Sequence, residues 1–455
     1  MVSPYPHIIR LARSGSLERA WSVMEQNGLL DSDTDQRALT LQARLVKDRA
    51  KLAEGAERAG LFAESAAIYA KAGAIDNGSY PLINAASLYL LAGQKAQSEK
   101  LARDVLKALD ENPDEAETPY WLGATRAEAL LLLGEQAQAR AALRGAVTKQ
   151  PAAWEDHAAT IGQFELLCAE LGCDAAWLDQ LRPPSAVHFS GIMNVAQSDE
   201  AAPRQISEWL ERENIGFGFG ALAAGSDIWI GEALLARGAQ LHVILPCDRA
   251  TFRAASVTIV DDAWGPRFDR LMDQAESICC LDHADAPDAA AVERGDAVAA
   301  GMAQHSATQL RANARRLRIV GSNDAISDPG EAAILKARRK GDRAPSRPAT
   351  ASGSLRAAVL SASGLEIFGS LADAWAAMGA RAESCAVDWI VSHSDEIPAP
   401  VPERLSAMLE CAVPGQCVAT HAAGYGLLGS GFDLRVESAG DMRWAGGLMP
   451  LYALF

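Results

Sequence analysis

The residues with the strongest chemical signal form a glycine-rich turn at 220–227, with the sequence GALAAGSD. The turn lies between a short apolar segment at 215–219 and a segment of helical composition at 228–237. A turn of this kind leaves backbone N–H groups unpaired at the positive end of the helix dipole. We therefore expect the turn to bind an anion, and a phosphate group in particular.

Two interpretations of the small residues in this turn stay open. The residues predicted to offer backbone N–H groups to a ligand are Gly220, Ala221, Ala224, Gly225 and Ser226, the last also offering a hydroxyl. Small residues are equally required where a strand and a helix pack closely. Asp227 repels an anion, so we expect it to cap the helix or to bind a sugar hydroxyl.

Neighbouring loops supply further candidate ligand residues. A predicted strand at 186–190 ends in Ser190 and Gly191, and ligands of a parallel sheet bind outside the carboxyl ends of its strands. Arg253 and Arg267 could direct their guanidinium groups at a phosphate, although lone surface arginines are more often solvated. His283, at the end of another predicted strand, is a further candidate.

The sequence predicts binding but no reaction. It shows no pair of carboxylates, no metal-ligand cluster and no nucleophile elbow, and its eight cysteines include no C-x-x-C spacing. Cys247 follows a predicted strand, but no histidine or aspartate is placed to activate it. We therefore predict no catalytic residue and no metal site, and we interpret the turn as part of a sensor pocket.

The elements that must position this pocket alternate between strand and helix over residues 185–330. The predicted strands are 186–190, 215–219, 240–245, 277–281 and 317–321, and the predicted helices are 202–212, 228–237, 267–274 and 289–315. Alternation of this kind is typical of an α/β, Rossmann-like parallel sheet. Pro246 is expected to end the third strand.

The stretch GALAAGSDIWIGEALLARGAQLHVILP resembles the SLOG superfamily, the Rossmannoid group that includes DNA-processing protein A and the LOG proteins. In that family a G-x-A-x-G-x-D turn precedes a helix, a glycine turn and an apolar strand ending in LP. Gly220, Gly225 and Asp227 match the turn, with one additional residue between the glycines. The resemblance implies a nucleotide or nucleotide-derived ligand. The P-G-G-x-G-T turn of the LOG phosphoribohydrolases is missing.

Residues 1–182 have the composition of an all-α solenoid. Gly15, Gly60, Gly93 and Gly134 are predicted to lie at the turns of paired helices, and the spacing of Gly60 and Gly93 is close to the tetratricopeptide period of about 34 residues. The segment resembles tetratricopeptide arrays and, faintly, the helical regulatory region of apoptosis signal-regulating kinases. A groove for a protein partner and an inert spacer or dimerisation surface are both compatible with it.

The remaining residues are predicted to form a linker and a small α/β domain. Residues 331–353 are basic and contain prolines, as a solvated linker does. Residues 354–455 resemble a class III nucleotide cyclase, from the opening SLRAAVLSASGLEIFGSL to the closing RVESAGDMRWAGGLMPLYALF. Cyclisation needs two metal-binding aspartates, but Ala362 stands at the first position and the Asp-Gly hairpin is missing. The resemblance implies an inactive, degenerate cyclase; an unrelated domain stays open.

Composition limits the partners. A net charge of −16 disfavours nucleic acid, whose phosphates require concentrated basic residues. No leader peptide and no long apolar run is evident, so we expect a cytoplasmic protein without a membrane anchor.

The leading hypothesis is a catalytically inactive signalling protein that senses a nucleotide and binds a protein partner. The alternative is an enzyme acting on a nucleotide in the SLOG-like pocket, or a residual cyclase. Homo-oligomerisation stays open.

Overall fold

The computed structural model describes most of the chain in two compact units, Met1–Pro183 and Pro184–Phe455. The described residues are 3–13, 17–76, 78–112, 115–196, 198–283, 285–324, 332–340, 353–379, 383–394 and 396–455. Among the helices of these residues, none combines the length and the apolar character that crossing a membrane requires.

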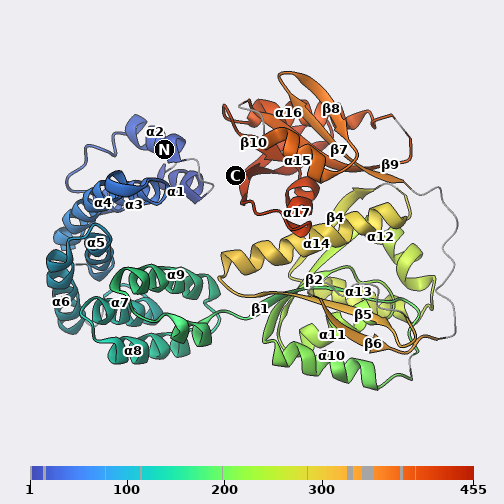
Figure 1. Ribbon diagram of the computed structural model, residues 1–455, viewed down its shortest axis with the longest axis horizontal. Coiled ribbons are helices and arrows are strands. Elements are labelled where there is room, and N and C mark those ends of the chain that lie inside the picture. The colour runs from blue at the N-terminus through green and yellow to red at the C-terminus, as the bar shows by residue number, and fades with distance from the viewer. Residues whose placement is uncertain are drawn as a thin grey trace. The chain divides into compact units, whose positions relative to one another are not determined.

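The first unit is helical, and its successive helices pack side by side (Figure 1). The α-helices are α1 Tyr5–Arg13, α2 Leu17–Gln26, α3 Gln36–Leu52, α4 Gly55–Asp76, α5 Ser79–Leu91, α6 Lys95–Glu111, α7 Pro119–Leu132, α8 Gln136–Lys149 and α9 Trp154–Leu171. A 3₁₀ turn at Ala176–Leu181 follows. Small residues bring α7 and α8 close together, since a Cβ at Gly123 would lie 2.8 Å from that of Ala146.

Two of the predicted glycine turns are confirmed and one is wrong. Gly93 separates α5 from α6 and Gly134 separates α7 from α8, with φ angles of +75° and +82° that favour glycine. Gly60 instead lies on the exposed surface within α4, and the turn before α4 uses Gly55, with φ of +56°. Spacing alone could not separate these two glycines, because only the turn position has a left-handed backbone. Gly15 lies outside the described residues.

The second unit begins with a six-stranded sheet of order β4-β3-β2-β1-β5-β6, in which every pairing is parallel. Its strands are β1 Ser185–Ser190, β2 Ile215–Gly220, β3 Gln240–Cys247, β4 Ser277–His283, β5 Ala314–Gly321 and β6 Ala333–Ala337. From β1 the strands run outward to β4, and β5 then pairs on the other side of β1. Strand order therefore reverses between β1 and β5, and such a point is where open α/β sheets bind ligands.

Helices cover both faces of this parallel sheet. The helices that share a hydrophobic core with one face are α10 Ala201–Arg212, α11 Ser226–Ala236 and α13 Trp264–Gln274. The opposite face carries α14, Ala289–Gln309 (Figure 1). A short α12, Arg249–Phe252, and a π-helical turn, Arg253–Thr258, connect β3 to α13.

The structure corrects three local predictions. Residues 333–337, expected within the linker, form the edge strand β6, where a charged side chain such as Lys336 is tolerated because an edge is solvated. Pro246 does not end β3, which continues to Cys247 with an irregular register after Leu245. α14 ends at Gln309 because the chain reverses through Arg311, with φ of +50°.

The second sheet has the order β11-β12-β10-β9-β7-β8, and only the β9–β10 pairing is parallel among its described pairs. Its strands are β7 Ser354–Ser361, β8 Gly364–Phe368, β9 Cys385–Ser392, β10 Cys417–Ala419, β11 Val436–Trp444 and β12 Gly447–Leu454. Its helices are α15 Leu371–Gly379, α16 Pro400–Cys411 and α17 His421–Gly429. α17 packs against α14, and this contact between helices connects the two sheets (Figure 1).

His421, at the start of α17, should make stability depend on pH. Its Nδ1 lies 3.0 Å from the Tyr452 hydroxyl, and burial lowers its pKa to about 4. The unfolded chain has the ordinary pKa of about 6.5, so protonation favours unfolding. The contribution of neutral His421 to the free energy of unfolding is complete above pH ~6.5. It falls by up to about 3 kcal/mol as the pH falls toward 4.

Urea unfolding at pH 7, 6, 5 and 4 tests this prediction. His421→Gln removes the titrating group, and the loss of stability on acidification should become smaller. It should not vanish, since burial also lowers the pKa of His305. His7→Gln, at an exposed position, is the control and should leave the pH dependence unchanged. An identical pH dependence in His421→Gln would contradict the assignment.

Candidate functional site

A cavity of about 730 Å³ lies where the strand order of the parallel sheet reverses. The exits of β1 and β5, the turn between β2 and α11, and one side of α14 line it. This is the location that parallel-sheet geometry assigns to a ligand. The volume falls within the range of about 300–1,000 Å³ that small-molecule sites occupy.

Four residues singled out from the sequence line this cavity: Ser190, Gly191, Ala221 and Asp227. Ser190 ends β1 and Gly191 follows it, while Ala221 begins the turn after β2 and Asp227 is the second residue of α11. The other predicted residues of the turn, Gly220, Ala224, Gly225 and Ser226, are not among the lining residues. The turn therefore contributes Ala221 and Ala223 to the cavity, while Ala224 and Gly225 serve packing.

The amide groups at the centre of the turn bind other parts of the backbone. Ser226 is fully buried, its N–H donates to the Ile192 carbonyl at 3.1 Å, and its Oγ accepts from the Ile192 N–H at 2.7 Å. The Ala224 N–H donates to the Ser256 carbonyl at 2.9 Å. The Ser226 donor thus holds the loop after β1 and the Ala224 donor holds the π-helical turn, so neither is available to a ligand.

Glycine at two positions of the turn allows close backbone approach. A Cβ at Gly225 would lie 2.4 Å from the Met193 carbonyl oxygen, and φ of +103° disfavours any side chain there. A Cβ at Gly220 would lie 2.6 Å from the Phe189 carbonyl oxygen. Gly220 thus allows close approach to β1 itself, and Gly225 allows close approach to the loop after β1.

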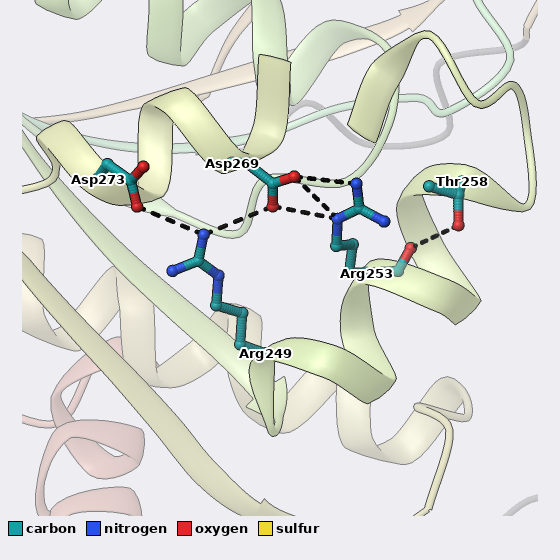
Figure 2. A network of polar contacts seen from close by, with 5 residues as sticks. All are labelled: Arg249, Arg253, Thr258, Asp269 and Asp273. Carbon is teal, nitrogen blue, oxygen red and sulfur yellow. Dashed lines mark hydrogen bonds and ion pairs between the residues drawn. The ribbon is translucent and has the colours of Figure 1, made fainter. Parts of the chain in front are cut away.

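The guanidinium groups of Arg253 and Arg267 lie elsewhere, each paired with a carboxylate. Figure 2 shows Arg253 bound to Asp269, with Nη2 and Oδ2 separated by 2.9 Å, in a network that also includes Arg249 and Asp273. Arg267 binds Glu232, with Nε and Oε1 separated by 2.8 Å. Neither arginine lines the cavity, so the structure does not bring them to the other predicted residues.

Asp227 presents a buried carboxyl group to the cavity. The N-cap of α11 is Gly225, so Asp227 lies within the first turn of the helix and does not cap it. Burial, together with repulsion from Asp296, raises the pKa of Asp227 well above its usual range, against opposing hydrogen bonds from the backbone. Its Oδ1 is buried and has no hydrogen-bond partner among the described residues. A ligand hydroxyl or amino group would satisfy this oxygen.

The cavity also contains charged residues that sequence reasoning missed. Strand alternation places Arg316 and Arg318 of β5 on the face covered by α14, while Leu317 and Ile319 enter the core on the opposite face. Arg318 is exposed and forms no ion pair with a described residue. Arginine at every second position of a buried strand was the signal that could have identified them.

Four other polar residues complete the lining. Arg339, which follows β6, binds Asp324 with Nη2 and Oδ2 separated by 2.7 Å. His188 of β1 lies opposite Asp296 of α14, with Nε2 and Oδ1 separated by 3.4 Å. The cavity therefore combines guanidinium groups for an anion with carboxylates for hydroxyl or amino groups.

In the second sheet, the position expected to hold a metal-binding aspartate is Ala362, in the turn between β7 and β8. Asp388, on the neighbouring strand β9, is buried and has other partners. Its carboxylate forms an ion pair with Arg404 and accepts a hydrogen bond of 2.8 Å from the Thr420 hydroxyl. This carboxylate therefore already has two side-chain partners.

Part of the N-terminal unit matches a known family model. Residues 7–90 match the model of Tetratricopeptide Repeats-Sensor, which agrees with the helix pairs of the first unit. The N-terminal region thus has tetratricopeptide-like repeats, and the match supports a signalling or sensing role. Repeats of this type generally bind other proteins. No curated protein matches the sequence.

Proposed function

We propose that this protein is a cytoplasmic sensor that binds a nucleotide, or an anion derived from one, in the cavity between β1 and β5. The observation that carries the proposal is that, in the described part of the chain, one cavity combines a guanidinium group without an ion-pair partner and a buried carboxyl oxygen without a hydrogen bond. Arg318 has no ion-pair partner among the described residues, and Asp227 has a buried oxygen without a hydrogen bond. A ligand with a phosphate and a hydroxyl or amino group satisfies both.

The lining favours a nucleotide over a simple anion. Arg316 and Arg318 lie two residues apart on one strand and can hold adjacent phosphate oxygens. Asp296 would repel a second phosphate, and both Asp227 and Asp296 can accept hydrogen bonds from a sugar or a base. The likeness of 185–325 to the SLOG superfamily supports the same class of ligand.

The helical repeats and the second sheet would complete the sensor. We propose that the repeats bind a protein partner, as tetratricopeptide arrays do. We further propose that residues 354–455 are a cyclase-like domain without activity, an assignment supported by Ala362 in the turn after β7 and by Asp388 in its ion pair with Arg404. Ligand binding would then alter one protein surface that the partner recognises, and the ligand would not be converted to a product.

One observation favours an enzyme as the second candidate function. His188 and Asp296 face each other in the cavity wall at 3.4 Å. An imidazole oriented by a carboxylate can act as a general base toward a water molecule or a ligand hydroxyl. Turnover that depends on His188 would show that the protein is a hydrolase or transferase acting on a nucleotide and not a sensor without activity.

Thermal shift and product analysis of the full chain with ATP, GTP, NAD and cyclic nucleotides test both functions. We expect a nucleotide to raise the Tm without being consumed. Arg318→Ala should weaken binding by about 10- to 150-fold, since a charge-assisted hydrogen bond contributes about 1.5–3 kcal/mol. The matched control is Arg315→Ala, because Arg315 lies on the same strand but binds Glu213 at 3.1 Å outside the cavity.

Each outcome has a defined meaning. A shift that Arg318→Ala abolishes and Arg315→Ala retains supports the cavity as the binding site. A shift of equal size in the wild type and in Arg318→Ala would place the ligand elsewhere. Product formation that stops in His188→Ala would establish the enzymatic alternative. No response to any of these nucleotides would contradict the proposed ligand class.

A further inference from the structure

Two histidines and one aspartate meet at the border between the two sheets of the second unit. His283 is the last residue of β4, Asp288 is the N-cap of α14, and His393 directly follows β9. One potential ligand atom from each residue lies within 4.8 Å of the other two. None of the three lines the nucleotide cavity, so this cluster is a separate feature of the molecule.

His283 is buried and has an unsatisfied ring nitrogen. The residue is 8% exposed, and its Nε2 is buried without a hydrogen-bond partner among the described residues. Its ring lies beside that of His393, with centroids 5.7 Å apart. A buried imidazole nitrogen without a partner is unfavourable, and coordination to a cation would remove that cost.

Asp288 is held in position by hydrogen bonds before any cation binds. Its Oδ1 accepts from the Ala291 N–H at 2.8 Å, and its Oδ2 accepts from the Gly353 N–H at 2.5 Å and lies 3.1 Å from His393 Nε2. These hydrogen bonds hold the carboxylate in one orientation, as an effective metal ligand requires.

We propose that His283, Asp288 and His393 bind one divalent transition-metal ion, for which Zn²⁺ is the best match. Two imidazole nitrogens and one carboxylate oxygen are a ligand set of zinc sites, with water at the fourth position. Metal bonds of about 2.0 Å place tetrahedral ligands roughly 3.3 Å apart, close to the 3.1 Å between His393 Nε2 and Asp288 Oδ2. The His393 side chain is 38% exposed and leaves a path for the ion.

The ion would connect the two sheets. His283 and Asp288 belong to the parallel sheet and to the helix that follows it, whereas His393 belongs to the second sheet. A cation bound by all three favours the arrangement in which the sheets are packed together, so binding raises the stability of the whole unit. This role is independent of the nucleotide cavity.

Zinc titration of the full chain, after removal of metals with a chelator, tests the proposal. Competition with a chromophoric chelator should give one Zn²⁺ per chain, and Co²⁺ should give the visible absorption of a tetrahedral site. His283→Ala and His393→Ala should each weaken Zn²⁺ binding by at least about 100-fold, because each removes one of three protein ligands. Exposed His7 provides the control, and His7→Ala should bind as the wild type does.

The thermal response separates this site from surface binding. Zn²⁺ should raise the Tm of the wild type and of His7→Ala but not of His393→Ala, whose exposed side chain is not required for folding. Asp288→Ala also removes a helix cap, so the histidine variants decide the result. Zinc binding that survives both histidine substitutions, or a stoichiometry well below one, would overturn the proposal.

Discussion

Arg404→Met is expected to lower the free energy of unfolding of the second unit by about 3–5 kcal/mol. Arg404, on α16, forms ion pairs with Asp388 of β9 and with Asp282 of β4, the latter with Nη1 and Oδ2 separated by 2.9 Å. Asp388 is only 2% exposed. Loss of the guanidinium leaves this carboxylate buried without its counter-charge, and breaking one side of a buried pair is far more costly than the pair's net contribution.

Chemical denaturation with urea measures this effect. Glu403→Met is the matched control, because Glu403 is exposed on the same helix and should change stability by less than about 0.5 kcal/mol. The double variant Arg404→Met with Asp388→Leu should recover part of the loss, since no unpaired charge stays buried. A loss below about 1 kcal/mol in Arg404→Met would mean that the pair is accessible to water.

Gly301→Ala should also destabilise the second unit, through the contact between α14 and α17. A Cβ at Gly301 would lie 1.8 Å from the Tyr425 carbonyl oxygen, and a Cβ at Gly429 would lie 1.9 Å from the Ala297 carbonyl oxygen. Backbone atoms cannot rotate away as a side chain can, so the two helices must separate. Overpacking of this kind costs about 1–3 kcal/mol and occasionally more.

Gly60→Ala provides the matched control for this prediction. Gly60 also lies within a helix, but a Cβ there meets no atom within 4 Å. Replacement of a helical glycine by alanine then stabilises by about 0.5–1 kcal/mol, because the unfolded chain loses conformational freedom. Opposite signs for the two substitutions, measured as changes in Tm, are the expected result. Stabilisation by Gly301→Ala would show that the two helices are further apart.

Much of the candidate site was predicted from local pattern. Alternation of apolar strands with helical segments indicated where each strand of the parallel sheet ends, and ligands bind at those ends. Ser190, Gly191 and Asp227 line the cavity for this reason. The turn between β2 and α11 was also located correctly. Its central amides were assigned to a ligand because the sequence shows that a donor is present but does not show which acceptor it binds.

Partners that are distant in the sequence could not be predicted. Ser226 bonds to Ile192 and Arg404 to Asp282 only because the fold brings their elements together. The arginines of β5 enter the cavity because the strand pairs with β1 in a register that turns them toward α14.

The amino-acid sequence by itself determined the helical repeats, the alternating strands and helices, and the loops at which a ligand can bind, because backbone preference and hydrophobic period act between near neighbours. Only the tertiary structure decided which amides are already bonded, which guanidinium groups lack a carboxylate, and that His283, Asp288 and His393 meet at the border of two sheets. Strand order and helix packing set those distances, and local sequence encodes neither.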